Sequence, residues 1–238
     1  MKNDEFIQLA RDVSNCHVCQ KMLTLPHSAG SEYLENDDHG FEEDSPYVNR
    51  WNLWQGNLEA DIMVIGQDYG QKSNIELWKS GDYKNPTDVG LRKLFKATFD
   101  IDIDSKGTPL FFTNMANCYR KNKTTGGMHP GWLPICANKF MARFIRIIDP
   151  KVIIVLGRSA FEALHCMEDL PIECTDACKS CKDTFSDIIT HNYALNLDGK
   201  SVGIFPVYHP GATSKRNRSE NEQVADWQRI ADYYEKVK

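Results

Sequence analysis

Three polar side chains in the sequence are suited to proton transfer and hydrogen bonding, and each follows a short apolar run. They are Asp68, Asn114 and His209. A loop carboxylate can act as a general base toward water, and an amide offers both a donor and an acceptor. A histidine can donate a hydrogen bond to an oxygen that gains negative charge. Each residue alone also fits a structural role, as a helix cap, an Asx turn or a packed histidine.

The cysteines are the second set of residues suited to chemistry. The sequence holds 8 cysteines, and the segment after Met1 does not resemble a secretory signal peptide. We therefore expect a cytoplasmic protein whose cysteines bind a metal or are simply buried, rather than being paired in disulfides. They fall into two groups. The first is Cys16, Cys19, Cys118 and Cys136, and the second is Cys166, Cys174, Cys178 and Cys181.

Four apolar runs predict the strands that position the three polar residues. Continuous apolar runs bounded by turns are typical of strands that helices cover on both faces. Asp68, Asn114 and His209 come after the first, second and fourth of these runs. The runs are 60–65, 110–113, 152–156 and 202–208.

Apolar residues at helical spacing predict helices between these strands and at both ends of the chain. The ranges are 3–13, 90–99, 134–148, 158–164 and 221–237. Strands that alternate with helices indicate an α/β fold, here a three-layer α/β/α sandwich with a central four-stranded parallel sheet. Ligands of such sheets bind beyond the carboxyl ends of the strands. We therefore expect the three polar side chains to converge at one edge of the sheet.

Composition and charge limit the classes of function. Hydrophobic residues make up 41% of the 238 residues and charged residues 26%, which favours a single packed domain over residues 1–238. The net charge of -5 gives no general attraction to DNA or to an anionic membrane, so nucleic-acid binding needs a local basic patch. No run approaches the roughly 20 apolar residues of a membrane span. An acidic loop at about 26–50 and a Cys-rich insertion at about 165–192 stand apart from the predicted elements.

Several motifs together resemble one known family. Residues 54–66 (WQGNLEADIMVIG) resemble the entry to the first motif of the uracil-DNA glycosylase superfamily, especially its iron-sulfur branch. The resemblance continues in Thr113-Asn114 with Cys118 four residues after the asparagine, in residues 150–157 (PKVIIVLG) and in His209-Pro210. The first motif departs from the iron-sulfur pattern, a Gly-Glu-Ala-Pro-Gly type. Its Gln-Asp pair is similar to that of other uracil glycosylases, but Tyr-Gly follows where those enzymes have Pro-Tyr-His.

The resemblance implies a uracil-DNA glycosylase-like fold and a hydrolase that cleaves the N-glycosidic bond of uracil, or of a related deaminated base, in base excision repair. Asp68 would stabilise the positively charged sugar and orient the attacking water. His209, as a neutral imidazole, would donate a hydrogen bond to the departing base, and Asn114 would match the uracil edge. Gly66, Gln67 and Tyr69 would complete the pocket, and the backbone N–H groups of Gln67 and Asp68 would help His209 at the departing base. Tyr69, Trp78 and Tyr83 are the candidate stacking aromatics.

The resemblance also implies a cofactor. The first cysteine group, Cys16, Cys19, Cys118 and Cys136, matches the four thiolates that hold a [4Fe-4S] cluster in the iron-sulfur branch. Four thiolates are equally sufficient for structural zinc. The spacing of Cys174, Cys178 and Cys181 would suit a second metal, against the alternative of buried or free thiols.

The expected partner is DNA that contains a damaged base, bound by a monomer with no membrane association. Lys215, Arg216 and Arg218 follow the histidine loop and would contact phosphates, the alternative being a solvated basic turn. Three other functions stay open. They are a glycosylase for a different base such as hypoxanthine or xanthine, a non-catalytic nucleic-acid-binding protein of the same fold, and a cysteine-centred redox or zinc module.

Overall fold

The computed structural model describes most of the chain, with several gaps. The described residues are 2–16, 18, 34–35, 57–68, 86–105, 107–117, 119–120, 131–176, 184–211 and 216–238. The acidic loop predicted at about 26–50 lies outside them, except for the short strand β1 (Leu34–Glu35), which pairs antiparallel with β4 (Tyr119–Arg120). No helix among the described residues has the length and apolar character needed to cross a membrane.

Four parallel strands form the centre of the fold, as the sequence predicts. They lie in the order β3-β2-β5-β8. Their residues are almost entirely buried, because helices cover both faces of the sheet. The strands are β2 (Ile62–Asp68), β3 (Leu110–Ala116), β5 (Val152–Leu156) and β8 (Lys200–Val207).

Among the described residues, two antiparallel strands that the sequence did not predict extend the four parallel strands to a sheet of six. Strand β7 (Tyr193–Leu197) pairs antiparallel with β8, and β6 (Ile172–Cys174) pairs antiparallel with β7. Both lie in or beside the predicted Cys-rich insertion. Strand β7 alternates buried and more exposed residues instead of forming a continuous apolar run, and its tight connection to β8 places Asp198 and Gly199 at positive φ. Such short alternating strands give a weaker sequence signal than buried parallel strands.

Two strands extend further than the apolar runs predict. Asp68 is the last residue of β2, and Asn114 lies within β3, paired with Gly66 in the parallel register. The prediction that both residues follow their strands is therefore wrong by a few residues. Strand pairing continues through these polar positions because backbone hydrogen bonding does not depend on side-chain polarity.

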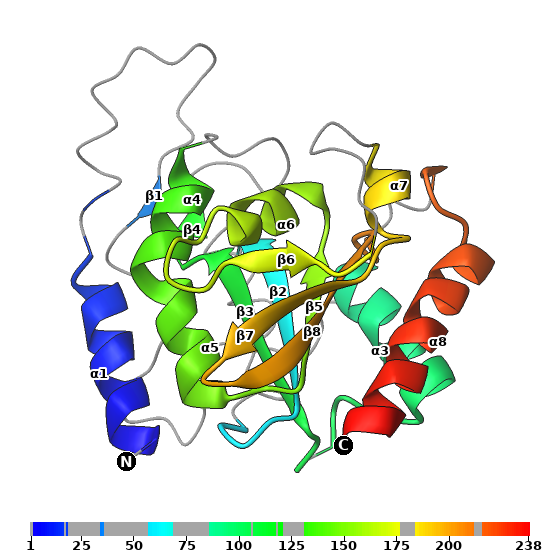
Figure 1. The fold of residues 1–238 in the computed structure, drawn as a ribbon, viewed down its shortest axis with the longest axis horizontal. Coiled ribbons are helices and arrows are strands. Elements are labelled where there is room, and N and C mark those ends of the chain that lie inside the picture. Colours follow the sequence, from blue (N-terminus) through cyan, green and yellow to red (C-terminus); the bar gives the residue numbers. More distant parts are fainter. Residues whose placement is uncertain are drawn as a thin grey trace.

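Helices cover the two faces of the sheet in separate groups (Figure 1). On one face, α3 (Pro86–Phe99) packs beside α8 (Glu220–Val237), where Phe95 meets Trp227 edge-on at 4.9 Å between ring centroids. Ser219 begins α8 with a capping box. These predicted helices are confirmed, with boundaries shifted by a few residues.

The other face is covered by one helical run and two further helices. The elements are α1 (Lys2–Ser14), α4 (Trp132–Cys136), the π-helix η2 (Ala137–Met141), α5 (Ala142–Ile148) and α6 (Arg158–His165). Helix α1 packs against α5, and Arg143 bonds to Asp12 at 2.6 Å. The single helix predicted at 134–148 is thus a continuous run from 132 to 148 with one π-helical turn in its middle. The remaining short helix, α7 (Phe185–Ile188), lies in the Cys-rich insertion.

Candidate active site at the carboxyl edge of the parallel sheet

The structure brings Asp68 and His209 close enough to interact electrostatically. Asp68 ends β2, and His209 stands two residues after the end of β8, so both lie at the carboxyl edge of the parallel strands. Burial lowers the pKa of His209 below its usual value, and the Asp68 carboxylate opposes part of that shift. Two residues 141 positions apart in the sequence therefore share one site, as the strand pattern predicts.

The hydrogen bonding of His209 identifies which nitrogen carries the proton. The backbone N–H of Gly211 donates to Nδ1 of His209 at 3.2 Å. Because Nδ1 accepts a hydrogen bond, the proton of the neutral ring resides on Nε2. The lowered pKa keeps the ring neutral near neutral pH. His209 therefore presents Nε2–H as a hydrogen-bond donor without a full positive charge.

Small residues fix the loop that carries His209. A Cβ atom on Gly211 would lie 3.0 Å from Nδ1 of His209 and 3.4 Å from the Thr87 hydroxyl at the start of α3. Gly157, which follows β5, has φ of +92°, a conformation that favours glycine, and a Cβ there would be 3.9 Å from Cβ of His209. The β5 turn and the first turn of α3 thus approach His209 from different sides.

Asn114 is a buried amide with unused hydrogen-bonding capacity. Its side chain is 0% exposed, and neither Oδ1 nor Nδ2 has a hydrogen-bond partner among the described residues. A Cβ on Gly66 would lie only 2.3 Å from Asn114 Oδ1, so the amide fits against β2 because residue 66 has no side chain. A buried amide of this kind costs stability unless a ligand supplies its partners.

Gln67 has a role that the sequence did not indicate. Its Nε2 donates a hydrogen bond to Oδ2 of Asp68 at 3.0 Å. This bond orients the carboxylate. The sequence predicts only a backbone contribution from Gln67, because the spacing of residues along a strand end does not reveal the direction of a flexible side chain.

Two further buried polar residues border this region and are missing from the sequence prediction. Asn117, just after β3, is 1% exposed and has no side-chain partner among the described residues. Asp88, in the first turn of α3, is 5% exposed, and burial raises its pKa to about 7. Its helix packs on the His209 loop, since a Cβ on Gly90 would lie 2.6 Å from the Pro210 carbonyl oxygen. Sequence alone did not indicate the buried carboxyl group of Asp88, because an acidic residue at the start of a helix is usually exposed and stabilises the helix end.

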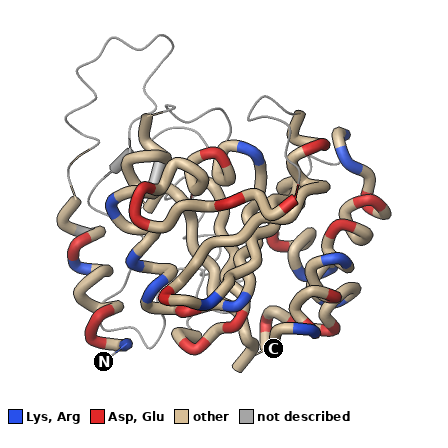
Figure 2. Tube along the Cα trace, viewed as in Figure 1, with Lys and Arg blue, Asp and Glu red and all other residues tan. Residues whose placement is uncertain are grey.

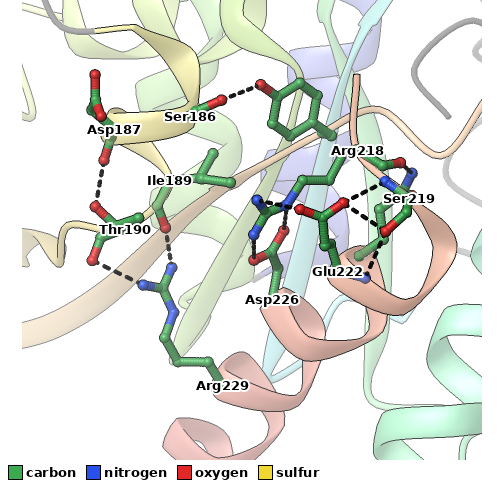
Figure 3. A network of polar contacts seen from close by, with 11 residues as sticks. Ser186, Asp187, Ile189, Thr190, Arg218, Ser219, Glu222, Asp226 and Arg229 are labelled. Atoms are coloured by element: carbon green, nitrogen blue, oxygen red, sulfur yellow. Dashed lines mark hydrogen bonds and ion pairs between the residues drawn. The ribbon is translucent and has the colours of Figure 1, made fainter. Parts of the chain in front are cut away.

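The predicted phosphate-binding residues differ in their surroundings. Arg216 is exposed. Arg218 instead donates to both carboxylate oxygens of Asp226, at 2.9 and 2.6 Å, and to Glu222 at 3.3 Å (Figure 3). Its charge is largely compensated within the protein. Along α8 the acidic residues outnumber the basic ones, so this helix does not form a basic patch (Figure 2).

Several predicted residues lie outside the described part of the chain. They are Tyr69, Trp78, Tyr83, Lys215, Cys19, Cys118, Cys178 and Cys181. Of the first cysteine group, Cys16 follows α1 and is partly buried, whereas Cys136 ends α4 and is buried. Helices α1 and α5 pack side by side, so these two cysteines belong to neighbouring helical segments. The π-helical turn begins directly after Cys136, and such turns are frequent at functional sites.

The second cysteine group contains a cluster with metal-binding donors. Cys174, Asp176 and His191 each place one ligand atom within 4.8 Å of the others. The expectation that the cysteines avoid disulfides is wrong for Cys174, which is disulfide-bonded. Cys166 is exposed and not part of the cluster.

Comparison with known proteins places this site in a family. The family model "Uracil DNA glycosylase superfamily" matches residues 53–231. The chain is 24% identical over 177 residues to a Type-4 uracil-DNA glycosylase of Archaeoglobus fulgidus, covering 74% of this chain and 78% of that protein. It is 26% identical over 160 residues to a Type-4 uracil-DNA glycosylase of Saccharolobus solfataricus, covering 66% of this chain and 64% of that protein.

The matched region includes the strands that carry Asp68, Asn114 and His209, and it extends into α8. The family match thus agrees with the α/β architecture and with the resemblance of the strand-end motifs. The chain belongs to the uracil DNA glycosylase superfamily.

Proposed function

We propose that this protein is a uracil-DNA glycosylase that hydrolyses the N-glycosidic bond of uracil in DNA, a reaction of base excision repair. The observation that carries the proposal is the neutral His209 ring, with its proton on Nε2, beside the Asp68 carboxylate. Bond cleavage develops positive charge on the sugar and negative charge on the base. This pair supplies one group for each charge.

Asp68 acts on the sugar side of the bond. Its carboxylate stabilises the positive sugar and accepts a proton from the water that attacks the anomeric carbon. Gln67 holds Oδ2 of that carboxylate through the 3.0 Å hydrogen bond, which fixes the orientation of the base catalyst. Gln67 is therefore a positioning residue.

His209 and Asn114 act on the base. Nε2–H of His209 donates to the base oxygen on which negative charge accumulates. The amide of Asn114 pairs with one carbonyl and one N–H of the uracil edge, a pattern that cytosine does not offer. Burial makes this pairing selective, because a mismatched base leaves two buried polar atoms without partners.

The cysteines of the first group fit an iron-sulfur cluster. We assign Cys16, Cys19, Cys118 and Cys136 as its ligands, on the chemistry of four thiolates and on the relatives being Type-4 enzymes. A bound [4Fe-4S] cluster supplies a structural link between the start of the chain and α4. Zinc in the same four thiolates is the alternative. An absorption spectrum with iron and zinc analysis distinguishes the two metals.

DNA is the proposed partner. Lys215 and Arg216 are the better candidates for contacts with phosphates flanking the target, since Arg218 is engaged with Asp226 and Glu222. Arg218 instead ties the segment before α8 to the helix through its bonds to Asp226. Changing Arg216 to Ala should weaken DNA binding and reduce its salt dependence.

The test is product analysis on a panel of oligonucleotides. Single- and double-stranded DNA with uracil, hypoxanthine or xanthine is incubated with the wild type and with Asp68→Asn and Asp232→Asn. Asp232 is an exposed carboxylate on α8 and serves as the matched control. We expect free uracil and an abasic site with the wild type and Asp232→Asn. If only hypoxanthine or xanthine were released, the proposed substrate would be wrong. If no base were released, the protein would not be the proposed enzyme.

A further inference from the structure

Gly90 is a buried glycine inside helix α3, at a position where the backbone conformation does not require a glycine. Glycine is less favourable than alanine within a helix, because it loses more conformational freedom on folding. The φ angle of Gly90 is not among the positive values that favour glycine. The remaining physical reason for a glycine here is the close approach of another part of the chain.

The carbonyl group of Pro210 makes that approach. A Cβ atom on Gly90 would lie 2.6 Å from the Pro210 carbonyl oxygen, 2.8 Å from Cβ of Pro210 and 3.2 Å from its carbonyl carbon. Two of these three atoms belong to the backbone, so no change of side-chain rotamer can make room for the new atom. A methyl group at residue 90 would therefore force either α3 or the loop after β8 to move.

Helix α3 is the less movable of these two partners. It lies beside α8 (Figure 1), and its Phe95 packs edge-on against Trp227 of α8 at 4.9 Å between ring centroids. Phe95 also meets Phe112 of β3 edge-on at 6.0 Å, and all three rings are buried. Because such closely packed interiors resist displacement, the loop that carries His209 would take up most of the shift.

The Pro210–Gly211 peptide connects this contact to the imidazole ring. The carbonyl oxygen that faces Gly90 and the Gly211 N–H belong to one planar peptide unit. That N–H donates the 3.2 Å hydrogen bond to Nδ1 of His209. Because a planar peptide moves as a unit, displacing its oxygen also redirects its N–H. The proline ring fixes φ of residue 210, so the loop has little freedom to absorb the change.

The opposite flank of the same peptide is also close to its neighbours. A Cβ atom on Gly211 would lie 3.0 Å from Nδ1 and 3.2 Å from Cε1 of His209. It would also lie 3.4 Å from the hydroxyl oxygen of Thr87, in the first turn of α3. Two glycines, one in the helix and one in the loop, thus allow the helix, the peptide and the imidazole ring to stay in contact.

We propose that Gly90 is a positioning residue for His209. Its missing side chain lets the Pro210–Gly211 peptide rest against α3 in the orientation that keeps the Gly211 N–H on Nδ1 and the ring proton on Nε2. Nε2–H donates to the departing base in the proposed glycosylase reaction, so the inference rests on that proposed function. Gly90 acts only through the loop and is not a catalytic residue.

The first measurement is kcat and KM of uracil release for Gly90→Ala beside Gly203→Ala. Gly203 is the matched control, because a Cβ atom there would also lie 2.6 Å from a neighbouring atom, Cε1 of Tyr233. Gly203 is paired with Val152 at the start of β5, away from the carboxyl edge. We expect Gly90→Ala to lose roughly 10- to 100-fold in kcat with a nearly unchanged KM, since a misplacement of about 1 Å can cost about 10²-fold. Gly203→Ala should keep the wild-type kcat.

The second measurement does not depend on activity. NMR of the full-length protein labelled with ¹⁵N-histidine, at a pH where the ring is neutral, reports which ring nitrogen carries the proton. Comparison with His209→Ala identifies the His209 signals among the 7 histidines. The wild type and Gly203→Ala should show a proton on Nε2 and a hydrogen-bonded Nδ1. Gly90→Ala should shift the Nδ1 signal toward that of a nitrogen without a hydrogen-bond donor, which a purely structural glycine would not do.

Two results would overturn the proposal. One is a folded Gly90→Ala variant with the wild-type His209 signals. The other is a wild type in which Nδ1 of His209 carries the proton. If the wild type released no uracil, the proposed function would be wrong, but the NMR comparison would still test how His209 is positioned.

A double variant keeps the test decisive if Gly90→Ala does not fold. Gly90→Ala/Pro210→Gly removes the proline ring and its Cβ, which gives the loop room to accept the new methyl group. Pro210→Gly alone is its reference. The His209 signals of the double variant should differ from those of the reference in the direction expected for Gly90→Ala, and identical signals would overturn the proposal.

Discussion

The parallel and the antiparallel parts of the sheet carry different chemistry. At the carboxyl edge of β2, β3 and β8, the polar groups are mostly buried and offer hydrogen-bonding and titratable atoms, as Asn114 and His209 show. At the antiparallel edge of β6 and β7, a partly exposed cluster combines sulfur, imidazole and carboxylate. Burial at the parallel edge lowers the pKa of His209, whereas His191 lies at the more exposed antiparallel edge, so burial separates the two regions.

Apart from loss of the catalytic base, the largest effect should come from His209→Ala. Losing a donor to the leaving base should lower kcat for uracil release by roughly 10²- to 10³-fold. Single-turnover kinetics on a uracil oligonucleotide measure this effect. His165→Ala, an exposed histidine at the end of α6, should leave the rate unchanged. If His209→Ala released uracil at nearly the wild-type rate, His209 would not stabilise the leaving base, and the proposed role of the parallel edge would be wrong.

Gly66→Ala should damage both recognition and stability. The new Cβ would lie 2.3 Å from Oδ1 of Asn114, so the amide must move. We expect a loss of about 1–3 kcal/mol in the free energy of unfolding, typical of overpacking, together with a lower kcat/KM for uracil. Urea denaturation and kinetics measure the two quantities. In an Asn114→Ala background the same substitution should cost less stability, and an equal cost would show that Asn114 is not the obstacle.

Asp88→Asn should change how stability depends on pH. Burial raises the pKa of Asp88 to about 7, so the folded protein holds a proton that the unfolded chain loses above its ordinary value of 3.8. The wild type therefore loses stability as pH rises from about 4 to 7, and the neutral amide avoids this loss. We expect Asp88→Asn to be more stable than the wild type by on the order of 2 kcal/mol at pH 8, but not at pH 4. Thermal unfolding of both proteins at pH 4 and pH 8 measures this difference in stability. An equal difference at both pH values would contradict the raised pKa of Asp88.

Ser186→Ala should have the smallest effect, and it probes the connection between the two regions. It removes the 2.8 Å hydrogen bond to Tyr208 while keeping the ring contact with Phe185. We expect a loss of about 0.5–1.5 kcal/mol in the free energy of unfolding and a change of a few-fold in kcat. A loss of activity as large as that of His209→Ala would mean that α7 belongs to the catalytic machinery itself.

The parallel half of the fold was predictable from sequence because its strands are continuous apolar runs. The run at 152–156 coincides with β5, and the three polar residues were placed at the correct edge for the same reason. Predicted boundaries failed at Asn114, where a polar residue continues a buried strand. Asp88 and the side chain of Gln67 were missed because burial of a helix-start acid and the direction of a long side chain depend on contacts distant in sequence.

The antiparallel half was much harder to predict. Strand β6 has three residues and β7 alternates in burial, so neither gives a strong periodic signal. The spacing of Cys174, Cys178 and Cys181 suggested a metal, but it could not identify His191, which comes to Cys174 only through the pairing of β6 with β7. The contact of Asp176 with Asn192 and His191 likewise becomes visible only in the structure.

The most direct test of the central proposal is single-turnover release of uracil by the wild type beside Asp68→Asn. If the parallel edge holds the catalytic base, the wild type releases uracil and leaves an abasic site, and Asp68→Asn does so about 10²- to 10⁴-fold more slowly, the usual range for losing a general base. Asp232→Asn should match the wild type. Equal rates for Asp68→Asn and the wild type would contradict the account.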